Sequence, residues 1–374
     1  MKITKSLLST SVAAILAIAS STHTQAAQLD AGHSVFVMTN DAHANEVIAY
    51  ARTESGTLVF PHEFKTGGRG SGGEGDPLGS QGSLTLSQDR DWLFAVNAGS
   101  GTLSVFRVSD SRLILTDQVA TAGAEPVAVA QHGNLVYVLN AAGSSSVVGF
   151  YFNQGHLAQI DDSQRFLSAN GASPGSVTFS PDGKFLLATE KTGNNVDVFE
   201  VQGNGTLSPV KVDPSAGPGA FAVTVAPNGA AIVSETGSGG NTAAISSYSI
   251  HTDGTLATLS ASIPTDGAAN CWNAITPDGR FVYASNAGSS TLSGFAIGAN
   301  GVLSPLPGTV VGTNPTGSGN LDIAISANGK FLYSLNSAGG TLGQFGINPD
   351  GTLTNLGTVS GLPAGSSLNG IAAN

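Results

Sequence analysis

The stretch LDIAISANGKFLYSLNSAGGTLGQFGINPDGTLTNL, residues 321–356, contains the repeating unit of this chain. Its apolar residues alternate in four short runs, which are separated by the polar and glycine-containing segments 327–329, 336–340 and 348–351. Asn-Gly and Asp-Gly pairs accept positive φ angles at low cost and therefore favour tight hairpin turns. The stretch predicts a meander of four antiparallel strands.

The same unit recurs upstream, and each copy has a polar residue at the end of its second strand. This polar column consists of Asn40, Asn97, Asn140, Glu190, Glu235, Asn286 and Asn336. Successive members are 43 to 57 residues apart, a spacing typical of β-propeller blades. The sequence therefore predicts an all-β, seven-bladed β-propeller with four antiparallel strands in each blade.

The first copy lacks an innermost strand, because only three strands are predicted there, at 34–40, 46–52 and 57–60. The final residues 368–374, LNGIAAN, are similar to the start of the last unit, LDIAISAN. We expect this C-terminal strand to complete blade one and close the ring, which removes exposed strand edges. Blades two to seven are predicted at about 82–119, 126–167, 174–212, 218–263, 270–311 and 320–359.

The chain begins with a basic segment, an apolar run at 7–19 and small residues near position 26. The run is shorter than the roughly 20 residues of a membrane-spanning helix, so residues 1–26 are predicted to be a secretory signal peptide. Residues 27–374 are predicted to form a single propeller domain. We expect the processed protein in the periplasm or outside the cell, with no integral membrane segment.

Charge and cysteine content restrict the partners and the means of stabilisation. Removal of Lys2 and Lys5 leaves 12 basic and 25 acidic residues, a formal net charge of −13. Such an acidic surface repels phosphate backbones and argues against nucleic-acid binding. Cys271 is the only cysteine, so no disulfide can form within the chain. We expect a monomer stabilised by packing and ring closure.

In a propeller, the loops from second to third strands and the linkers between blades lie on one face, here called the linker face. The opposite face carries the turns between first and second strands, at 180–183, 226–229, 276–279 and 326–329, and is called the turn face. The polar column and the channel mouth make the linker face the predicted functional surface. The glycine-rich segment 66–81 is expected there as a mobile loop, or as a lid that carries Arg69.

Two groups of residues resemble a known family. Residues 185–191, FLLATEK, follow an SPDGK turn and precede NVDVF at 195–199, a pattern similar to that of the seven-bladed β-propeller lactonases. These include 6-phosphogluconolactonase-like enzymes and the carboxymuconate cyclases. Residues 271–283, CWNAITPDGRFVY, and 361–365, GLPAG, resemble an exported branch. The resemblance covers nearly all of the chain after residue 26 and implies a propeller that acts on a lactone.

The chain departs from this family at one position. Cytoplasmic members typically have Pro-Arg-His a few residues before the blade turn, which supplies a cation and a general base. The corresponding residues here are Pro-Gly-Ser at 174–176, Pro-Gly-Ala at 218–220 and Asn-Cys-Trp at 270–272. The base and the anion clamp of those enzymes therefore cannot be transferred to this chain.

Opening a lactone requires a group that activates water and a group that stabilises the oxyanion. Glu190 and Glu235 lie in neighbouring blades and are candidate bases, provided that partial burial raises the pKa of one carboxyl. Alternatively, each accepts backbone N–H bonds and caps a turn, as asparagine would. His43 is a third candidate base, or an ordinary surface residue.

Other residues on the linker face are candidates for substrate binding. They are Asn97, Asn140, Lys191, Trp272, Asn286, Asn336 and Arg69. The remaining histidines lack zinc-ligand spacing, and no metal or cofactor is predicted. Oxygen ligands for calcium are available at Asn140, Glu190, Glu235 and Asp322, without a calcium-loop motif. Cys271 has no neighbouring histidine and is expected to be buried.

Two functions remain open at this point. The first is an exported hydrolase or isomerase for a lactone of a sugar acid or aromatic acid. The second is a non-catalytic propeller that binds a protein, a glycan or a small ligand on its linker face.

Overall fold

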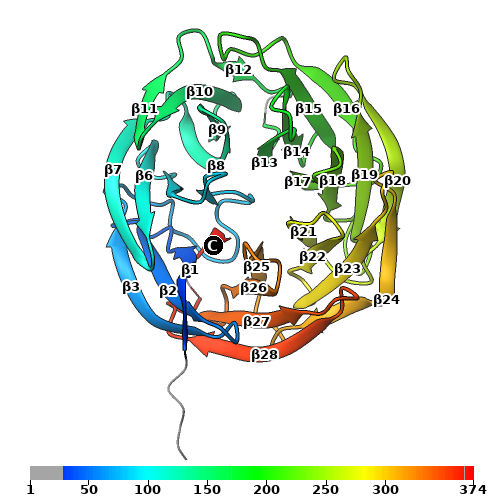
Figure 1. Ribbon diagram of the computed structural model, residues 1–374. Helices are drawn as coiled ribbons and strands as arrows, with labels where there is room; N and C mark the ends of the chain where they lie inside the picture. The colour runs from blue at the N-terminus through cyan, green and yellow to red at the C-terminus, as the bar shows by residue number, and fades with distance from the viewer. Residues whose placement is uncertain (1–27, 170, 366) are drawn as a thin grey trace, which may run out of the picture.

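The computed structural model describes residues 28–169, 171–365 and 367–374. This part of the chain forms strands and no helix, and its seven sheets are arranged in a ring (Figure 1). The innermost strands line a cavity at the centre of the ring, here called the channel. The prediction of an all-β, seven-bladed propeller is confirmed. Residues 1–26, the predicted signal peptide, lie outside the described residues, so that assignment stays a prediction.

Each blade is a sheet of antiparallel strands that runs outward from the channel. Blade one consists of β29 (Ile371–Ala373), β1 (Leu29–Met38), β2 (Glu46–Thr53) and β3 (Leu58–Lys65). Blade two consists of β4 (Leu84–Leu86), β5 (Trp92–Asn97), β6 (Thr102–Ser109) and β7 (Arg112–Ala120). Blade three consists of β8 (Ala124–His132), β9 (Leu135–Ala142), β10 (Ser146–Asn153), β11 (His156–Gln159) and β12 (Arg165–Phe166), of which the last two both pair with β10.

The remaining blades follow the same order. Blade four consists of β13 (Pro174–Phe179), β14 (Phe185–Glu190), β15 (Asn195–Glu200) and β16 (Lys211–Pro214). Blade five consists of β17 (Ala220–Val225), β18 (Ala230–Glu235), β19 (Ala244–Ile250) and β20 (Leu256–Pro264). Blade six consists of β21 (Asn270–Ile275), β22 (Phe281–Asn286), β23 (Thr291–Ile297) and β24 (Leu303–Thr313). Blade seven consists of β25 (Asn320–Ile325), β26 (Phe331–Asn336), β27 (Thr341–Ile347) and β28 (Leu353–Ser360).

The C-terminal strand completes blade one, as predicted. β29 pairs with β1, and Figure 1 places the C-terminus inside the ring beside β1. β29 is shorter than the expected 368–374, because the residues before it bind β1 outside the regular ladder: the Gly370 carbonyl accepts from Met38 N–H at 3.1 Å. β1 begins earlier than expected and has a register shift between Leu29 and Ser34.

The second strands are apolar along almost their whole length because neighbouring blades cover both of their faces. β14, β18 and β22 are buried at every residue. Tyrosines on second strands also bond to the outer turn of the next blade: the Tyr283 hydroxyl donates to Gly351 O at 2.7 Å, and the Tyr333 hydroxyl to Gly56 O at 2.8 Å. The core therefore lies between sheets rather than within one blade.

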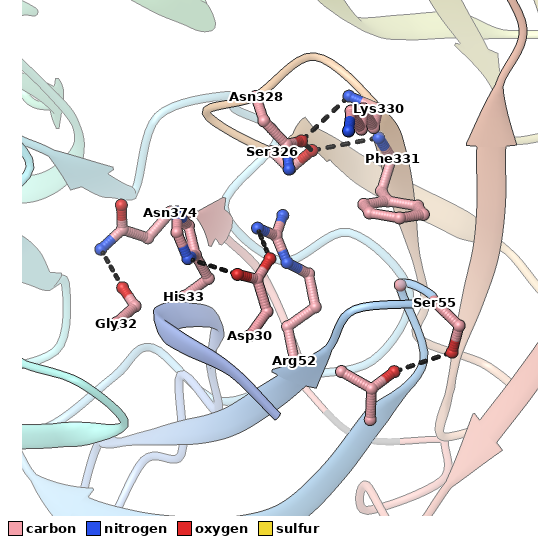
Figure 2. A network of polar contacts seen from close by, with 12 residues as sticks. Asp30, Gly32, His33, Arg52, Ser55, Ser326, Asn328, Lys330, Phe331 and Asn374 are labelled. Carbon is pink, nitrogen blue, oxygen red and sulfur yellow. Dashed lines mark hydrogen bonds and ion pairs between the residues drawn. The ribbon is translucent and has the colours of Figure 1, made fainter. Parts of the chain in front are cut away.

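A buried arginine joins blade one to blade seven on the turn face (Figure 2). The Arg52 side chain is fully buried and donates through Nη2 to Asp30 Oδ2 at 2.6 Å. Its guanidinium lies 5.4 Å from the ring centroid of Phe331 in blade seven, and Asp30 also pairs with His33 Nδ1 at 3.0 Å. The closure between first and last blades thus has a charged contact in addition to the β29 ladder.

Candidate functional site

The polar column lies on the linker face, at the end of the second strand or within two residues of it in every blade. All seven side chains are fully buried, with an exposed fraction of 0%. Asn97 and Asn286 each donate from Nδ2 to hydroxyls five and seven residues later on the third strand. Asn336 repeats the first of these bonds, to Thr341 Oγ1 at 3.3 Å. In blades two, six and seven the column asparagine therefore holds the second and third strands together at their linker-face ends.

Glu190 occupies the same structural position as the asparagines. Its carboxylate accepts from Ser168 Oγ at 2.8 Å, from Ala169 N–H at 3.0 Å and from Asn195 Nδ2 at 3.3 Å. Asp197 lies close by, and burial, with the charge of Glu190, raises the pKa of Asp197 to about 7. These contacts fix the linker before blade four. A role for Glu190 as a base stays a prediction.

Glu235 makes the equivalent contacts in blade five. Its Oε1 accepts from Gly217 N–H at 2.7 Å, from Ser246 Oγ at 2.6 Å and from Ser215 Oγ at 3.0 Å. Its Oε2 is buried without a partner among the described residues. The carboxylate thus binds the linker before β17 and the third strand β19, and its proposed catalytic role likewise remains a prediction.

Two of the other candidates lie at the surface. The His43 side chain is 97% exposed, and its ring lies 3.7 Å from the Asp41 carboxylate. Arg69 is also exposed, and its backbone carbonyl accepts from Gly99 N–H at 3.0 Å. His43 therefore lies beside Asp41 at an exposed loop, so its role as a base and the role of Arg69 in substrate binding stay predictions.

Segment 66–81 does not hang free over the face, in contrast to the mobile loop or lid expected. Gly70 N–H donates to Asp41 O at 2.7 Å, and a Cβ at Gly70 would lie 2.1 Å from the carbonyl of Asn40, so only glycine allows this approach. At its other end, Gln81 N–H donates to Gly175 O at 2.8 Å. The segment therefore connects blade one to blade four and lies inside the ring (Figure 1).

Trp272 helps to hold this segment. Its side chain is fully buried, with the indole Nε1–H donating to Ser80 O at 2.9 Å and the ring 5.1 Å from that of Phe221, edge to face. This contact accounts for the large aromatic at the start of an innermost strand. Trp272 therefore anchors segment 66–81, and its buried ring offers no exposed surface to a ligand.

Segment 66–81 brings an acidic residue to the channel mouth, where it meets residues from three other elements. We call Asp76, Lys191, Cys271 and Asn369 the channel-mouth cluster. Asp76 Oδ1 accepts from Asn369 Nδ2 at 2.9 Å and from Gly79 N–H at 3.0 Å. Lys191 is partly buried, with Nζ 5.3 Å from the ring centroid of Phe221. The cluster thus combines an oriented carboxyl with an ammonium group.

The charges in this cluster act on one another. Burial raises the pKa of Asp76 to about 6, although the Gly79 N–H, the positive charge of Lys191 and Asn369 all work in the opposite direction. Burial also raises the pKa of the Cys271 thiol to about 12, and the charge of Asp76 adds to this shift. Cys271 is therefore a buried thiol, as expected, and Asp76 is a carboxyl that titrates near neutral pH.

Asp322 is a second carboxyl on the channel side, in the innermost strand of blade seven. It is 2% exposed and has a positive φ of 62°, which is uncommon for a residue other than glycine. Its Oδ1 accepts from its neighbour Ile323 N–H at 2.9 Å, and its Oδ2 from Ile371 N–H at 3.3 Å. Burial raises the pKa of Asp322 to about 7, with a contribution from the charge of Asp76.

Lys191 was a candidate on the linker face and Cys271 was expected to be buried, whereas Asp76 and Asn369 were not among the predicted site residues. Asp76 lies in the glycine-rich segment outside the repeat, whereas Asn369 lies in the C-terminal residues that resemble the start of a blade. The only sequence signal was an acidic residue in a segment that departs from the blade pattern.

The larger cavities lie toward the turn face, opposite to the face that the sequence favoured. One, of about 470 Å³, is lined by the innermost strands of blades two to five. A second, of about 380 Å³, is lined by Asp322, Arg90 and β29.

Within the described residues no three His, Cys, Asp or Glu side chains gather as a metal site, and the calcium candidates lie in separate blades. No helix in the same residues has the length and hydropathy to span a membrane.

Comparisons with known proteins connect this geometry to a fold group. No protein-family model and no curated protein matches the chain. A candidate 6-phosphogluconolactonase from Bacteroides uniformis is 21% identical, with a TM-score of 0.69 over 92% of this chain and 100% of that chain. A second from Bacteroides fragilis is 18% identical, with a TM-score of 0.70 over 92% and 98%.

A periplasmic gluconolactonase from Pseudomonas aeruginosa is 20% identical, with a TM-score of 0.68 over 90% of this chain and 99% of that chain. At these identities the likeness concerns the fold, and it extends over nearly the whole ring. The chain therefore has the architecture of the lactonase-like seven-bladed β-propellers.

Proposed function

We propose that the chain is an exported lactonase that hydrolyses the lactone of a sugar acid or an aromatic acid at the channel mouth. The observation that supports this most directly is the oriented Asp76 carboxyl, held by Asn369 and Gly79, with the Lys191 charge close enough to act on its pKa. The fold likeness to a candidate 6-phosphogluconolactonase and to a periplasmic gluconolactonase agrees with it. The predicted signal peptide agrees with export to the periplasm or beyond.

Asp76 is the proposed general base. Asn369 and Gly79 fix its Oδ1, so the carboxyl has a defined direction. A carboxyl with a pKa of about 6 is mostly ionised at pH 7 and is a stronger base than an ordinary aspartate. It would take a proton from water as the water oxygen attacks the lactone carbonyl carbon.

Lys191 is the proposed electrostatic partner. As the carbonyl becomes tetrahedral, negative charge develops on its oxygen, and a nearby ammonium stabilises that charge. Collapse of the intermediate breaks the ring C–O bond, and the proton held by Asp76 passes to the departing alkoxide. The product is an open hydroxy acid, whose new carboxylate remains attracted to Lys191.

The test is a turnover assay of the processed protein on sugar-acid and aromatic-acid lactones, corrected for spontaneous hydrolysis. Asp76→Asn is expected to lower kcat/KM at least about 100-fold, in the range for loss of a general base. Asp350→Asn, at an exposed outer turn, is the matched control. In the wild type, kcat/KM should rise with pH and level off above about 6, since the base must be ionised.

Variants of the column separate the competing bases. Glu190→Gln and Glu235→Gln should reduce activity only in proportion to lost folding stability. If one of them abolishes turnover with an unchanged melting temperature while Asp76→Asn stays active, the base is in the column and not at Asp76. Product analysis by NMR distinguishes hydrolysis from isomerisation.

The second candidate function is binding without catalysis on the same face. The absence of the Pro-Arg-His residues and the firm attachment of segment 66–81 across the mouth favour it. A complete lack of turnover on every lactone, together with binding of an open sugar acid that Lys191→Met removes, would favour this alternative.

A further inference from the structure

The turn-face end of the channel contains a cavity that the proposed lactonase site does not use. Its volume is about 470 Å³, and its walls come from β4, β8, β13 and β17. Gln81 lies at its inner end, where the side-chain Nε2 donates to Asn273 O at 3.0 Å and Oε1 accepts from Asn273 N–H at 2.9 Å. Segment 66–81 therefore contributes Gln81 to this cavity and Asp76 to the channel-mouth cluster.

Threonine hydroxyls line three of the walls at equivalent positions. Thr85, Thr178 and Thr224 each stand two residues before the first residue of a strand-connecting turn. Thr85 Oγ1 donates to Gly82 O at 3.1 Å, and Thr224 Oγ1 donates to Asn273 Oδ1. The Thr178 hydroxyl makes no hydrogen bond to any residue that the structure describes. It is consequently available to a molecule in the cavity.

The lining has almost no charge. His132 is the only ionisable side chain among the residues that line this cavity, and its Nε2 already lies 3.1 Å from Pro181 O. A charged ligand would find no counter-ion among these residues to offset any loss of its hydration. Val225, which is partly exposed, adds apolar surface beside the hydroxyls. This combination suits a ligand that is neutral and has both C–H surface and hydroxyl groups.

We propose that this turn-face cavity binds a small neutral carbohydrate, a mono- or disaccharide. Its volume lies within the usual range of small-molecule sites, roughly 300–1,000 Å³. Sugar hydroxyls both donate and accept hydrogen bonds, as threonine hydroxyls do, so each can satisfy the other. The cavity is distinct from the proposed catalytic cluster, and its ligand need not be a lactone.

The test measures binding of maltose and cellobiose to the processed protein by saturation-transfer NMR and calorimetry at millimolar concentration, with glucuronate as the charged comparison. Thr178→Val keeps the shape and removes the hydroxyl, and the loss of one hydrogen bond should weaken binding about tenfold. Thr358→Val, on the exposed outer strand β28, is the matched control and should leave affinity unchanged. Thr178→Val should not change lactone turnover.

Each outcome decides the proposal. Binding of a neutral sugar that Thr178→Val weakens and Asp76→Asn leaves intact supports it. Absence of binding of both disaccharides, equal affinity in wild type and Thr178→Val, or stronger binding of glucuronate than of the neutral sugars would overturn it. Loss of sugar binding in Asp76→Asn would place the sugar at the channel mouth instead, and would contradict the proposal without affecting the lactonase test.

Discussion

The replacement Asp322→Asn should change how the stability of the protein depends on pH. Asp322 is buried beside the closing strand, and burial raises its pKa to about 7 from an ordinary value of 3.8. Below pH 3.8 the carboxyl is protonated in both the folded and the unfolded state, so its ionisation does not change the free energy of unfolding. Between pH 3.8 and 7 the unfolded chain releases the proton while the folded chain keeps it, and the folded state loses stability as pH rises.

The magnitude follows from the size of the shift. Each pKa unit corresponds to about 1.4 kcal/mol, so the full cost above pH 7 is about 4 kcal/mol, of which about 2–3 kcal/mol develops between pH 5 and 8. Asparagine does not ionise and also tolerates a positive φ. Its oxygen can accept from Ile323 N–H, but its amide nitrogen cannot accept from Ile371, which costs about 1 kcal/mol at every pH.

The assay is urea unfolding at several pH values from 5 to 8. The difference in free energy of unfolding between Asp322→Asn and the wild type should shift by about 2–3 kcal/mol in favour of the variant as the pH rises from 5 to 8. Asp350→Asn is the control, because Asp350 is exposed, its pKa is lowered by the Thr352 hydroxyl and N–H, and it stays ionised throughout. Curves of wild type and Asp322→Asn that stay parallel from pH 5 to 8 would refute the assigned burial cost.

Three further predictions concern ring closure by β29, the anchoring of segment 66–81 and the accessibility of the Cys271 thiol. Truncation after Leu368 removes β29 and should lower the melting temperature by about 10 °C or more; an unchanged melting curve would mean that the strand does not close the ring. Trp272→Phe removes the bond to Ser80 O, costs about 1–2 kcal/mol, and should accelerate tryptic cleavage after Arg69, whereas an unchanged cleavage rate would contradict the anchoring role. Cys271, whose pKa burial raises to about 12, should react with a thiol reagent only in denaturant, and rapid labelling of the native protein would show that it is accessible.

Most of the fold could be predicted from the sequence because the blade repeats. The alternation of apolar residues and the Asn-Gly and Asp-Gly turns are local signals, and seven copies reinforce one another. Even the contact of greatest sequence separation, between β29 and β1, was predictable, since residues 368–374 resemble the start of another blade. The register shift in β1 and the divided outer edge of blade three were not predictable, because no repeat marks them.

The site could be predicted only in part, since a repeated position and a functional position look alike in one sequence. Glu190 and Glu235 stood out because asparagine fills the column elsewhere. In the structure both bind linkers and third strands as the asparagines do. Burial and hydrogen-bond partners, which distinguish a structural carboxylate from a catalytic one, depend on contacts that the alternation of polar and apolar residues does not specify.

A residue that recurs in every blade solves a problem that every blade has, which here is the attachment of a linker to the next sheet. A site for one substrate requires an asymmetric arrangement, and a ring of similar sheets obtains it where the repeat is interrupted. Segment 66–81 is such an interruption, and its Asp76 accepts a hydrogen bond from Asn369, which lies beside the strand that closes the ring. Since Asn369 lies two residues before the closing strand, closure of the ring and orientation of the proposed base depend on the same few residues. Asn369→Ala should therefore reduce lactone turnover more than it reduces stability, and equal losses in both would indicate a purely structural role.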